Sequence, residues 1–166
     1  QFNIKPHIDM INNPVGGYGQ GVCNVKYEIR RGNPNEASPT QMSNDIVVFR
    51  LSEIMFIKAE CLMRKNGGNA TGDAVDLVND VRARSFDPGD PDAAYTTGTL
   101  TMDELLDERG REFAYEMKRR EDLIRFEKFE DARWEKPADD NTFRRIYPIP
   151  FNILSANPAL EQNPGY

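Results

Sequence analysis

The spacing of apolar residues changes along the chain, and the change predicts where helices lie. Up to about Asn44 the sequence is rich in Gly, Pro and Asn, which is typical of loops, with Val22 to Ile29 as a short extended stretch. From Asn44 to about Lys65 apolar residues recur every three or four positions, which predicts an amphipathic helix that Asn66-Gly67-Gly68 stops. Its apolar positions are Val48, Leu51, Met55, Ala59 and Leu62, with Glu53, Glu60 and Arg64 elsewhere.

A second amphipathic helix is predicted from about Gly72 to Ser85, ended by Pro88 and Gly89. It is expected to bury Ala74, Leu77, Val78 and Val81. With the first helix it forms an αα-hairpin.

The third predicted helix begins at a capping box. In this motif the side chain of Thr101 accepts a hydrogen bond from a first-turn backbone amide, and the side chain of Glu104 reaches back to the amide of Thr101. One face carries Leu106, Gly110, Phe113, Met117 and Ile124. The helix either runs unbroken to about Phe129 or bends near Lys118. From Trp134 to Tyr147 the chain is predicted to be loop.

The final residues combine turn formers with apolar anchors. Pro, Asn and Gly favour turns, and the apolar anchors are Ile149, Ile153, Leu154, Leu160 and Tyr166. We expect this tail to dock on the helices and the chain to end here naturally.

Composition and charge exclude several classes of function. The 166 residues are 39% hydrophobic and 29% charged, which suits one domain with a real core. The formal net charge of −6 disfavours nucleic acid and acidic membrane surfaces as partners. The sequence shows neither a signal peptide nor an apolar run long enough to span a bilayer.

Metal and cofactor chemistry find little support in the residues. Cys23 and Cys61 have no CxxC partner and His7 is the single histidine, so no zinc site is predicted. We interpret both cysteines as buried small apolar residues rather than a disulfide. The acidic loop of Asp87, Asp90 and Asp92 lacks the pattern of an EF-hand and is interpreted as a turn. No cofactor is expected.

Three glutamates lie four residues apart in the third helix, and paired carboxylates are what glycoside hydrolysis requires. They are Glu108, Glu112 and Glu116. Each has a basic residue one turn away, and the predicted pairs are Glu108 with Arg111, Arg109 with Glu112, Glu116 with Arg119 or Arg120, and Glu121 with Arg125. Such partners lower a carboxylate pKa, so we interpret the ladder as structural and expect no catalytic residue.

Two aromatic residues are candidates for binding sugar rings, because sugars present flat faces of C–H groups. Trp134, the only Trp, lies among charged and amide side chains, and Tyr18 lies in a glycine-rich loop. The competing interpretation is that Trp134 packs on the helices.

Three stretches together resemble the SusD/RagB family of outer-membrane nutrient-binding lipoproteins. They are the tail from Tyr147-Pro148-Ile149-Pro150 to Gln162-Asn163-Pro164-Gly165-Tyr166, the helix from Asp45 to Leu62, and the block from Leu100 to Phe129 with Glu108-Arg109 and Arg119-Arg120. The resemblance covers about Asp45 to Tyr166. Met117 and Glu127 stand where the family usually has Gly, and Glu121 where it often has Trp, which predicts a more continuous helix here.

The resemblance implies a mainly α fold of helical hairpins in a tetratricopeptide-like superhelix with long irregular loops. It divides the chain into a loop-rich lead-in, 1–44, and a helical domain with a docked tail, 45–166. Members are much longer, so we expect a carboxy-terminal piece, with a lipid anchor and most of the binding face upstream.

The function that the resemblance implies is non-catalytic. The protein is expected to bind glycans or other nutrients at the outer face of the outer membrane and to deliver them to a SusC-like TonB-dependent transporter. Two alternatives remain, a helical-repeat module that binds a partner protein and, weaker, a fragment of a glycoside hydrolase.

Overall fold

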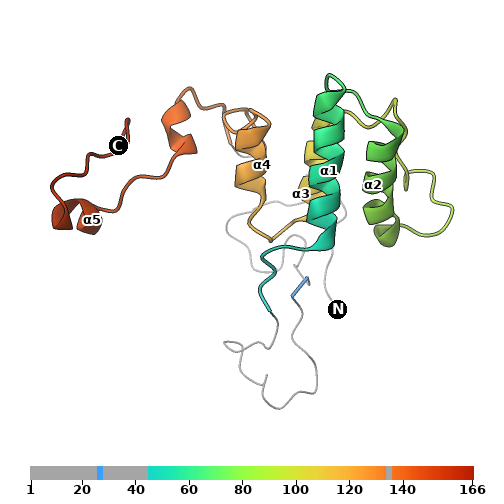
Figure 1. Ribbon diagram of the computed structural model, residues 1–166, viewed down its shortest axis with the longest axis horizontal. Helices are drawn as coiled ribbons and strands as arrows, with labels where there is room; N and C mark the ends of the chain where they lie inside the picture. The colour runs from blue at the N-terminus through green and yellow to red at the C-terminus, as the bar shows by residue number, and fades with distance from the viewer. Residues whose placement is uncertain (1–25, 28–44, 134–135) are drawn as a thin grey trace, which may run out of the picture. The chain divides into compact units, whose positions relative to one another are not determined.

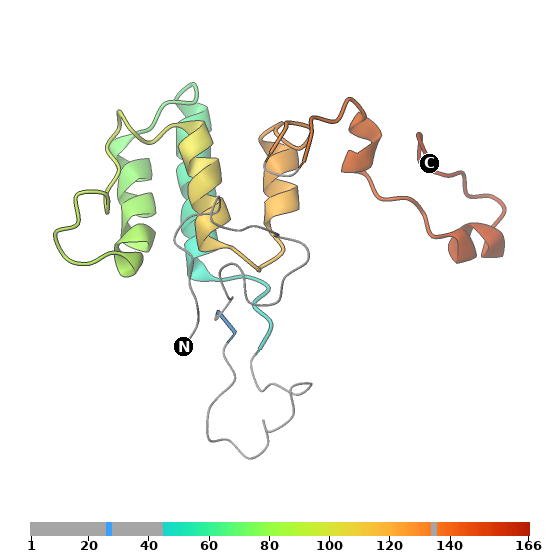
Figure 2. The same ribbon diagram turned by 180° about the vertical axis from the view of Figure 1, so that it is seen from behind.

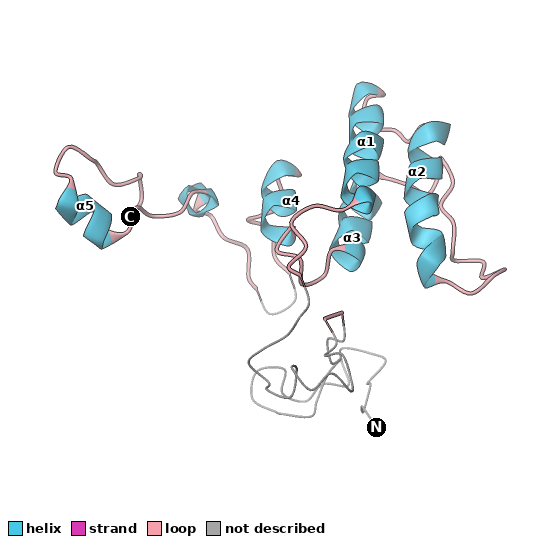
Figure 3. Cartoon of the chain, turned by 60° about the horizontal axis from the view of Figure 1, so that its bottom comes forward, coloured by secondary structure: helices cyan, strands magenta, loops and turns pink. Residues whose placement is uncertain are grey.

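The structure is a computed structural model that describes residues 26–27, 45–133 and 136–166. The chain divides into two units, 1–47 and 48–166, and the helices lie in the second (Figure 1). They are α1 (Leu51–Lys65), α2 (Gly72–Arg82), α3 (Met102–Glu112), α4 (Arg119–Arg125) and α5 (Phe151–Ala156), with 3-10 turns at Ala83–Ser85 and Thr142–Arg145. The described residues contain helices and loops but no named strand, which confirms the mainly α class (Figure 3).

Helices α1 and α2 form the predicted αα-hairpin, and Figures 1 and 2 show them side by side. Helix α1 ends where predicted, because Gly67 and Gly68 take φ values of +67° and +87°. The amide of Gly68 then reaches back to the carbonyl of Met63 at 2.9 Å. Helix α2 begins at a cap in which Thr71 Oγ1 accepts from the amide of Ala74 at 3.2 Å.

The start and the buried face of α1 differ from the prediction. The helix begins at Leu51 instead of Asn44, and Val48 and Leu51 are 64% and 75% exposed. The buried positions are Ser52, Glu53, Phe56, Ala59, Glu60 and Met63. Two of these are glutamates. The prediction, which places apolar residues inside and charged residues outside, therefore sets the buried face about one residue position away from the observed one.

The core lies between α1, α2 and α3. Its fully buried members are Phe56, Ala59, Met63, Ala74, Val78 and Leu105, and Leu100 and Phe113 are almost as deep. The rings of Phe56 and Phe113 meet edge to face with centroids 5.6 Å apart, an arrangement that adds to the gain from burial.

The third predicted helix is interrupted, so the expectation of a more continuous helix is wrong and the bend near Lys118 is confirmed. Helix α3 stops at Glu112 and α4 starts at Arg119. Between them Tyr115 and Met117 have φ values of +64° and +59°, and Glu127 beyond α4 has +60°. Left-handed backbone costs a non-glycine residue roughly 1–2 kcal/mol, so contacts elsewhere must impose these turns. Met117 is 82% exposed instead of facing the core.

A buried ion pair links the two halves of the interrupted helix. Arg109 donates from Nε and Nη2 to the two carboxylate oxygens of Asp122 at 2.9 and 2.8 Å, and both side chains are 2% exposed. The Arg109 guanidinium also lies over the ring of Phe113, 5.1 Å from its centroid. Paired charges of this kind are stable only together, because a single buried charge is costly.

Charge pairs also fasten α4 and the turn before it to α1. Arg125 contacts Asp122 at 2.8 Å and Glu60 at 2.9 Å, and Lys118 contacts Glu53 at 3.1 Å. Burial of Glu60 alone would raise its pKa, but hydrogen bonds from Arg125 and Arg64 outweigh this and lower the pKa below 4.5. The inward glutamates of α1 are therefore anchor points for α4.

The tail folds on itself in the described structure. The ring of Tyr166 meets that of Phe143 edge to face at 5.0 Å, its hydroxyl donates to the carbonyl of Ile146 at 2.8 Å, and Gln162 bonds both backbone groups of Ile149. Gly165 has φ +94°, and a Cβ there would lie 2.4 Å from Phe143 Cγ, so this turn requires glycine. Of the anchors, Ile153, Leu160 and Tyr166 are 47%, 40% and 48% exposed, and docking of the tail on the helices stays a prediction.

The predicted burial of the cysteines fails for Cys61, which is exposed on α1. Cys23 lies outside the described residues. The prediction follows the general tendency of free cysteines to be buried, and the position of Cys61 on the exposed side of α1 overrides that tendency.

We expect Asp122→Asn to lower the free energy of unfolding by about 3–5 kcal/mol, because it leaves the buried Arg109 guanidinium without its counter-charge. Chemical denaturation measures the change. Asp131→Asn is the control, since Asp131 and its partner Lys128 are exposed and 3.9 Å apart, and should cost less than about 1 kcal/mol. Equal losses in the two variants would contradict a central role for the buried pair.

Met117→Gly is expected to raise the free energy of unfolding by about 0.5–1 kcal/mol, because glycine removes the left-handed penalty at an exposed position. Glu121→Gly, at an exposed position inside α4, should instead lower it by about 1 kcal/mol. Thermal melts of both variants test the assignment. A loss of stability in Met117→Gly would mean that the turn is not strained.

Candidate functional site

A hollow of about 600 Å³ lies where the loop after α2 returns along α2 and α3. This volume falls within the range of small-molecule sites, about 300–1,000 Å³. The lining residues combine aromatic rings with both signs of charge and are Arg82, Phe86, Pro91, Asp92, Ala94, Tyr95, Thr99, Glu104 and Arg111. We call this site the Tyr95 hollow.

Arg82, at the end of α2, organises one wall of the hollow. Its guanidinium lies between two rings, 4.4 Å from the centroid of Phe86 and 4.6 Å from that of Tyr95. Its nitrogens donate to the carbonyls of Ala93 and Asp92 at 3.1 and 2.7 Å and pair with Glu108. Because Arg82 is only 11% exposed and fully engaged, it holds both rings in fixed positions.

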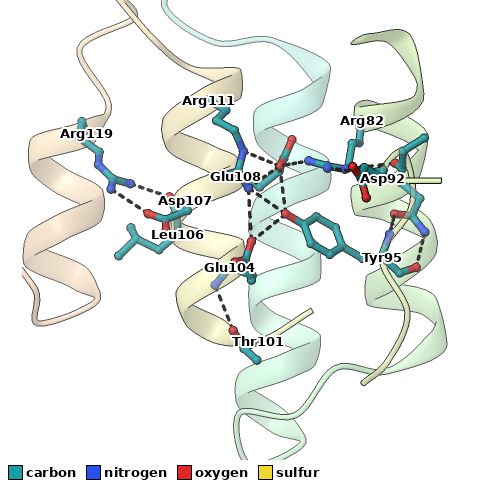
Figure 4. Close-up of polar contacts among 12 residues, drawn as sticks. Arg82, Asp92, Tyr95, Thr101, Glu104, Leu106, Asp107, Glu108, Arg111 and Arg119 are labelled. Atoms are coloured by element: carbon teal, nitrogen blue, oxygen red, sulfur yellow. Dashed lines mark hydrogen bonds and ion pairs between the residues drawn. The ribbon is translucent and has the colours of Figure 1, made fainter. Parts of the chain in front are cut away.

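Tyr95 connects the loop to α3, as Figure 4 shows. Its hydroxyl lies 2.9 Å from Glu104 Oε2 and 3.2 Å from Glu108 Oε2, and it accepts from Arg111 Nη2 at 2.8 Å. Its backbone exchanges two hydrogen bonds with the side chain of Asn79, at 2.8 and 3.0 Å. The loop is therefore fixed to both helices.

The environment of Tyr95 keeps its hydroxyl protonated. Burial disfavours the phenolate and the hydrogen bond to Glu104 stabilises the neutral form, which together raise the pKa of Tyr95 to about 12. A hydroxyl with this pKa is a hydrogen-bond donor near neutral pH and not a general base.

The capping box of α3 forms only in part. Thr101 Oγ1 accepts from the amide of Glu104 at 3.1 Å as predicted, but the amide of Thr101 donates to the carbonyl of Thr99. The Glu104 carboxylate is consequently available to Tyr95.

The carboxylates of α3 are held by basic side chains, which supports their structural interpretation. The predicted pair of Glu108 with Arg111 is confirmed at 2.8 Å. The other ion pairs differ from the predicted ones, and most of them join residues that lie further apart in the sequence. Arg109 binds Asp122, Glu116 binds Arg50 at 2.9 Å, Arg125 binds Asp122 and Glu60, and Glu112 pairs with Arg50 and Arg84.

The loop of Asp87, Asp90 and Asp92 folds as a pair of turns. The amide of Asp90 donates to the carbonyl of Asp87 at 3.1 Å, and Asp90 Oδ1 accepts from the amide of Asp92 at 2.9 Å. These bonds are those of an acidic turn, as the sequence indicates.

Trp134 and Tyr18, the predicted ligand-binding residues, lie outside the described residues and stay predictions. The Tyr95 hollow was missed from the sequence, because Arg82 lies 26 positions before Glu108 and Tyr95 lies 9 before Glu104. The one local feature of the sequence that points to the hollow is Glu104, which lies at a capping position of the third helix.

Comparison with known proteins identifies the family. The sequence model of the SusD family matches residues 5–139, and the chain belongs to this family. The starch-binding protein SusD of Bacteroides thetaiotaomicron is 34% identical over 161 residues, which are 92% of this chain and 27% of that protein. A SusD-like protein of Formosa agariphila is 30% identical over 142 residues, 75% of this chain and 25% of that protein.

The chain thus spans about a quarter of the length of the curated relatives it matches. None of the helices in the described part of the chain has the length and apolarity that crossing a membrane requires.

We expect spectrophotometric titration at alkaline pH to show one tyrosine that ionises near pH 12, and Tyr95→Phe to remove this step. Because the folded pKa lies above the ordinary value of 10.0, the stabilisation from Tyr95 is complete below pH 10 and is lost towards pH 12. The difference in melting temperature between the unmodified protein and Tyr95→Phe should therefore shrink above pH 10. A constant difference up to pH 12 would argue against the network.

Proposed function

We propose that the protein binds glycans at the cell surface without cleaving them. Membership of the SusD family is the observation that carries this proposal, supported by a relative that is a starch-binding protein. The hollow beside Tyr95 adds rings and hydrogen-bonding groups of the kind that sugar recognition uses.

Recognition without catalysis is also supported by the ion pairs. Glycoside hydrolysis needs one carboxyl group that can act as an acid and another that can act as a base or nucleophile. On α3, Glu108 is bound by Arg82 and Arg111, Glu112 by Arg50 and Arg84, and Glu116 by Arg50. Each of these carboxylates is thus engaged in ion pairs with one or two arginines, which supports a structural role for the three glutamates.

The delivery step and the location form the finer part of the proposal. The resemblance implies that the full-length protein is lipid-anchored, faces outward from the outer membrane and passes its glycan to a SusC-like TonB-dependent transporter. In the family the binding face draws largely on residues before this segment, so Trp134 and Tyr18 are proposed as contributors rather than as a complete site.

One observation favours the alternative of a protein-binding helical module. Leu51, Ile54 and Ile57 line one face of α1 and are 75%, 55% and 41% exposed. An apolar strip of this kind suits contact with another protein surface. Titration with glycans separates the two functions, since a module of the alternative class would bind none.

The full-length protein is expected to bind an oligosaccharide with a dissociation constant between about 1 μM and 1 mM and to release it unchanged. Calorimetric titration against a panel of oligosaccharides, followed by chromatography of the sugar, measures both properties. The present chain spans about a quarter of the length of its curated relatives and should bind more weakly. Shortened products after incubation would demand an enzyme instead.

A further inference from the structure

We propose that the Tyr95 hollow is a subsite for one neutral sugar ring of the glycan. The inference rests on the proposed function and extends it, because it assigns a place in this segment and a chemical class to the ligand. The argument uses the shape of the hollow, its spare hydrogen-bonding groups and its charge.

The walls of the hollow provide rigid aromatic surface. Phe86 and Tyr95 are both partly exposed, and Arg82 between them is fixed by three groups, the carbonyls of Asp92 and Ala93 in the loop and the carboxylate of Glu108 on α3. The C–H faces of a sugar pack on such rings, and rings that are already fixed lose little freedom when a ligand binds.

Two polar groups at the hollow retain capacity for a ligand. Glu104 and Arg111 have side chains that are 45% and 53% exposed. Their contacts within the network use Glu104 Oε2 and, on Arg111, Nε and Nη2. Glu104 Oε1 and Arg111 Nη1 make no hydrogen bond to the part of the chain that the structure describes. An acceptor beside a donor is the arrangement that two neighbouring sugar hydroxyls satisfy.

Charge selects a neutral ligand. The two guanidinium groups of Arg82 and Arg111 are balanced by the carboxylates of Glu104 and Glu108, and Asp92 adds one negative charge at the rim. An acidic sugar would find no net positive potential here and would compete with Glu104 for Arg111. The hollow therefore favours an uncharged hexose over a uronate or a sulfated sugar.

The test is a titration of the isotopically labelled chain with maltotriose, cellotriose and a trimer of galacturonic acid, followed by amide chemical shifts. We expect a neutral trisaccharide to shift amides of residues 86–111 with a dissociation constant in the millimolar range, and the galacturonate trimer to shift them far less. Shifts confined to other residues, or none with either neutral sugar, would overturn the subsite.

Two variants make the test sharper. Arg111→Ala should weaken binding at least tenfold, whereas Arg144→Ala should leave it unchanged. The control is matched, since Arg111 and Arg144 are 53% and 54% exposed, both pair with a carboxylate, and Arg144 lies outside the hollow. Glu104→Gln retains the shape of the side chain and should weaken binding with little change in the spectrum of the free protein, which separates loss of contact from loss of fold.

The failure of the subsite and of the proposed function are distinguishable in the full-length protein. If it binds glycans and Arg111→Ala leaves that binding and its sugar preference unchanged, and the chain shows no shifts at residues 86–111, the network is structural only and the proposed function stands. If the full-length protein binds no glycan of the panel, the proposed function fails and the subsite with it.

Discussion

The fold depends on a buried ion pair between two helices that the sequence pattern runs together. Arg109 and Asp122 join α3 to α4 across the break, and Arg125 extends the cluster to Glu60 of α1. A pair at this depth contributes little net stability by itself, since desolvation offsets most of the attraction. Its value lies in specificity, because neither charge tolerates any packing of the helices that separates it from its partner. The direction of the chain after Glu112 is therefore decided by electrostatics rather than by helix propensity.

The same organisation places the candidate site. Arg82 and Glu108 meet across α2 and α3, and the loop between these helices closes over them through Tyr95. Asn79 binds the backbone of Tyr95, and Glu104 and Glu108 contact its hydroxyl. Because the loop is fixed in this way, the hollow is already formed without a ligand. As the proposed subsite, a hollow with walls that are already fixed would bind a sugar ring without the cost of ordering the loop.

The sequence predicts those parts of the fold that local rules govern. The hairpin of α1 and α2, the Gly67-Gly68 stop and the Thr101 cap follow from helix periodicity, turn chemistry and capping, and they are found where expected. The errors arise where distant charges decide. Glu53 and Glu60 point inward, which the spacing of apolar residues does not predict. Met117 and Glu127 are helix formers in left-handed turns. The Tyr95 hollow escaped notice for the same reason, since its members are brought together only by the fold.

The non-glycine residues in the two left-handed turns have a consequence for which substitutions this sequence can accept. When tertiary contacts impose the backbone path, the residue at the turn no longer needs to specify it, and exchange between glycine and another side chain changes stability by only about 0.5–1 kcal/mol without redirecting the chain. β-branched residues are the exception, because their side chains tolerate this conformation least. Two homologous chains can therefore differ at both turns and follow the same course, provided that the ion pairs on either side are kept together. Substitutions at Arg109 and Asp122 should accordingly be linked, whereas those at positions 117 and 127 should be independent of each other.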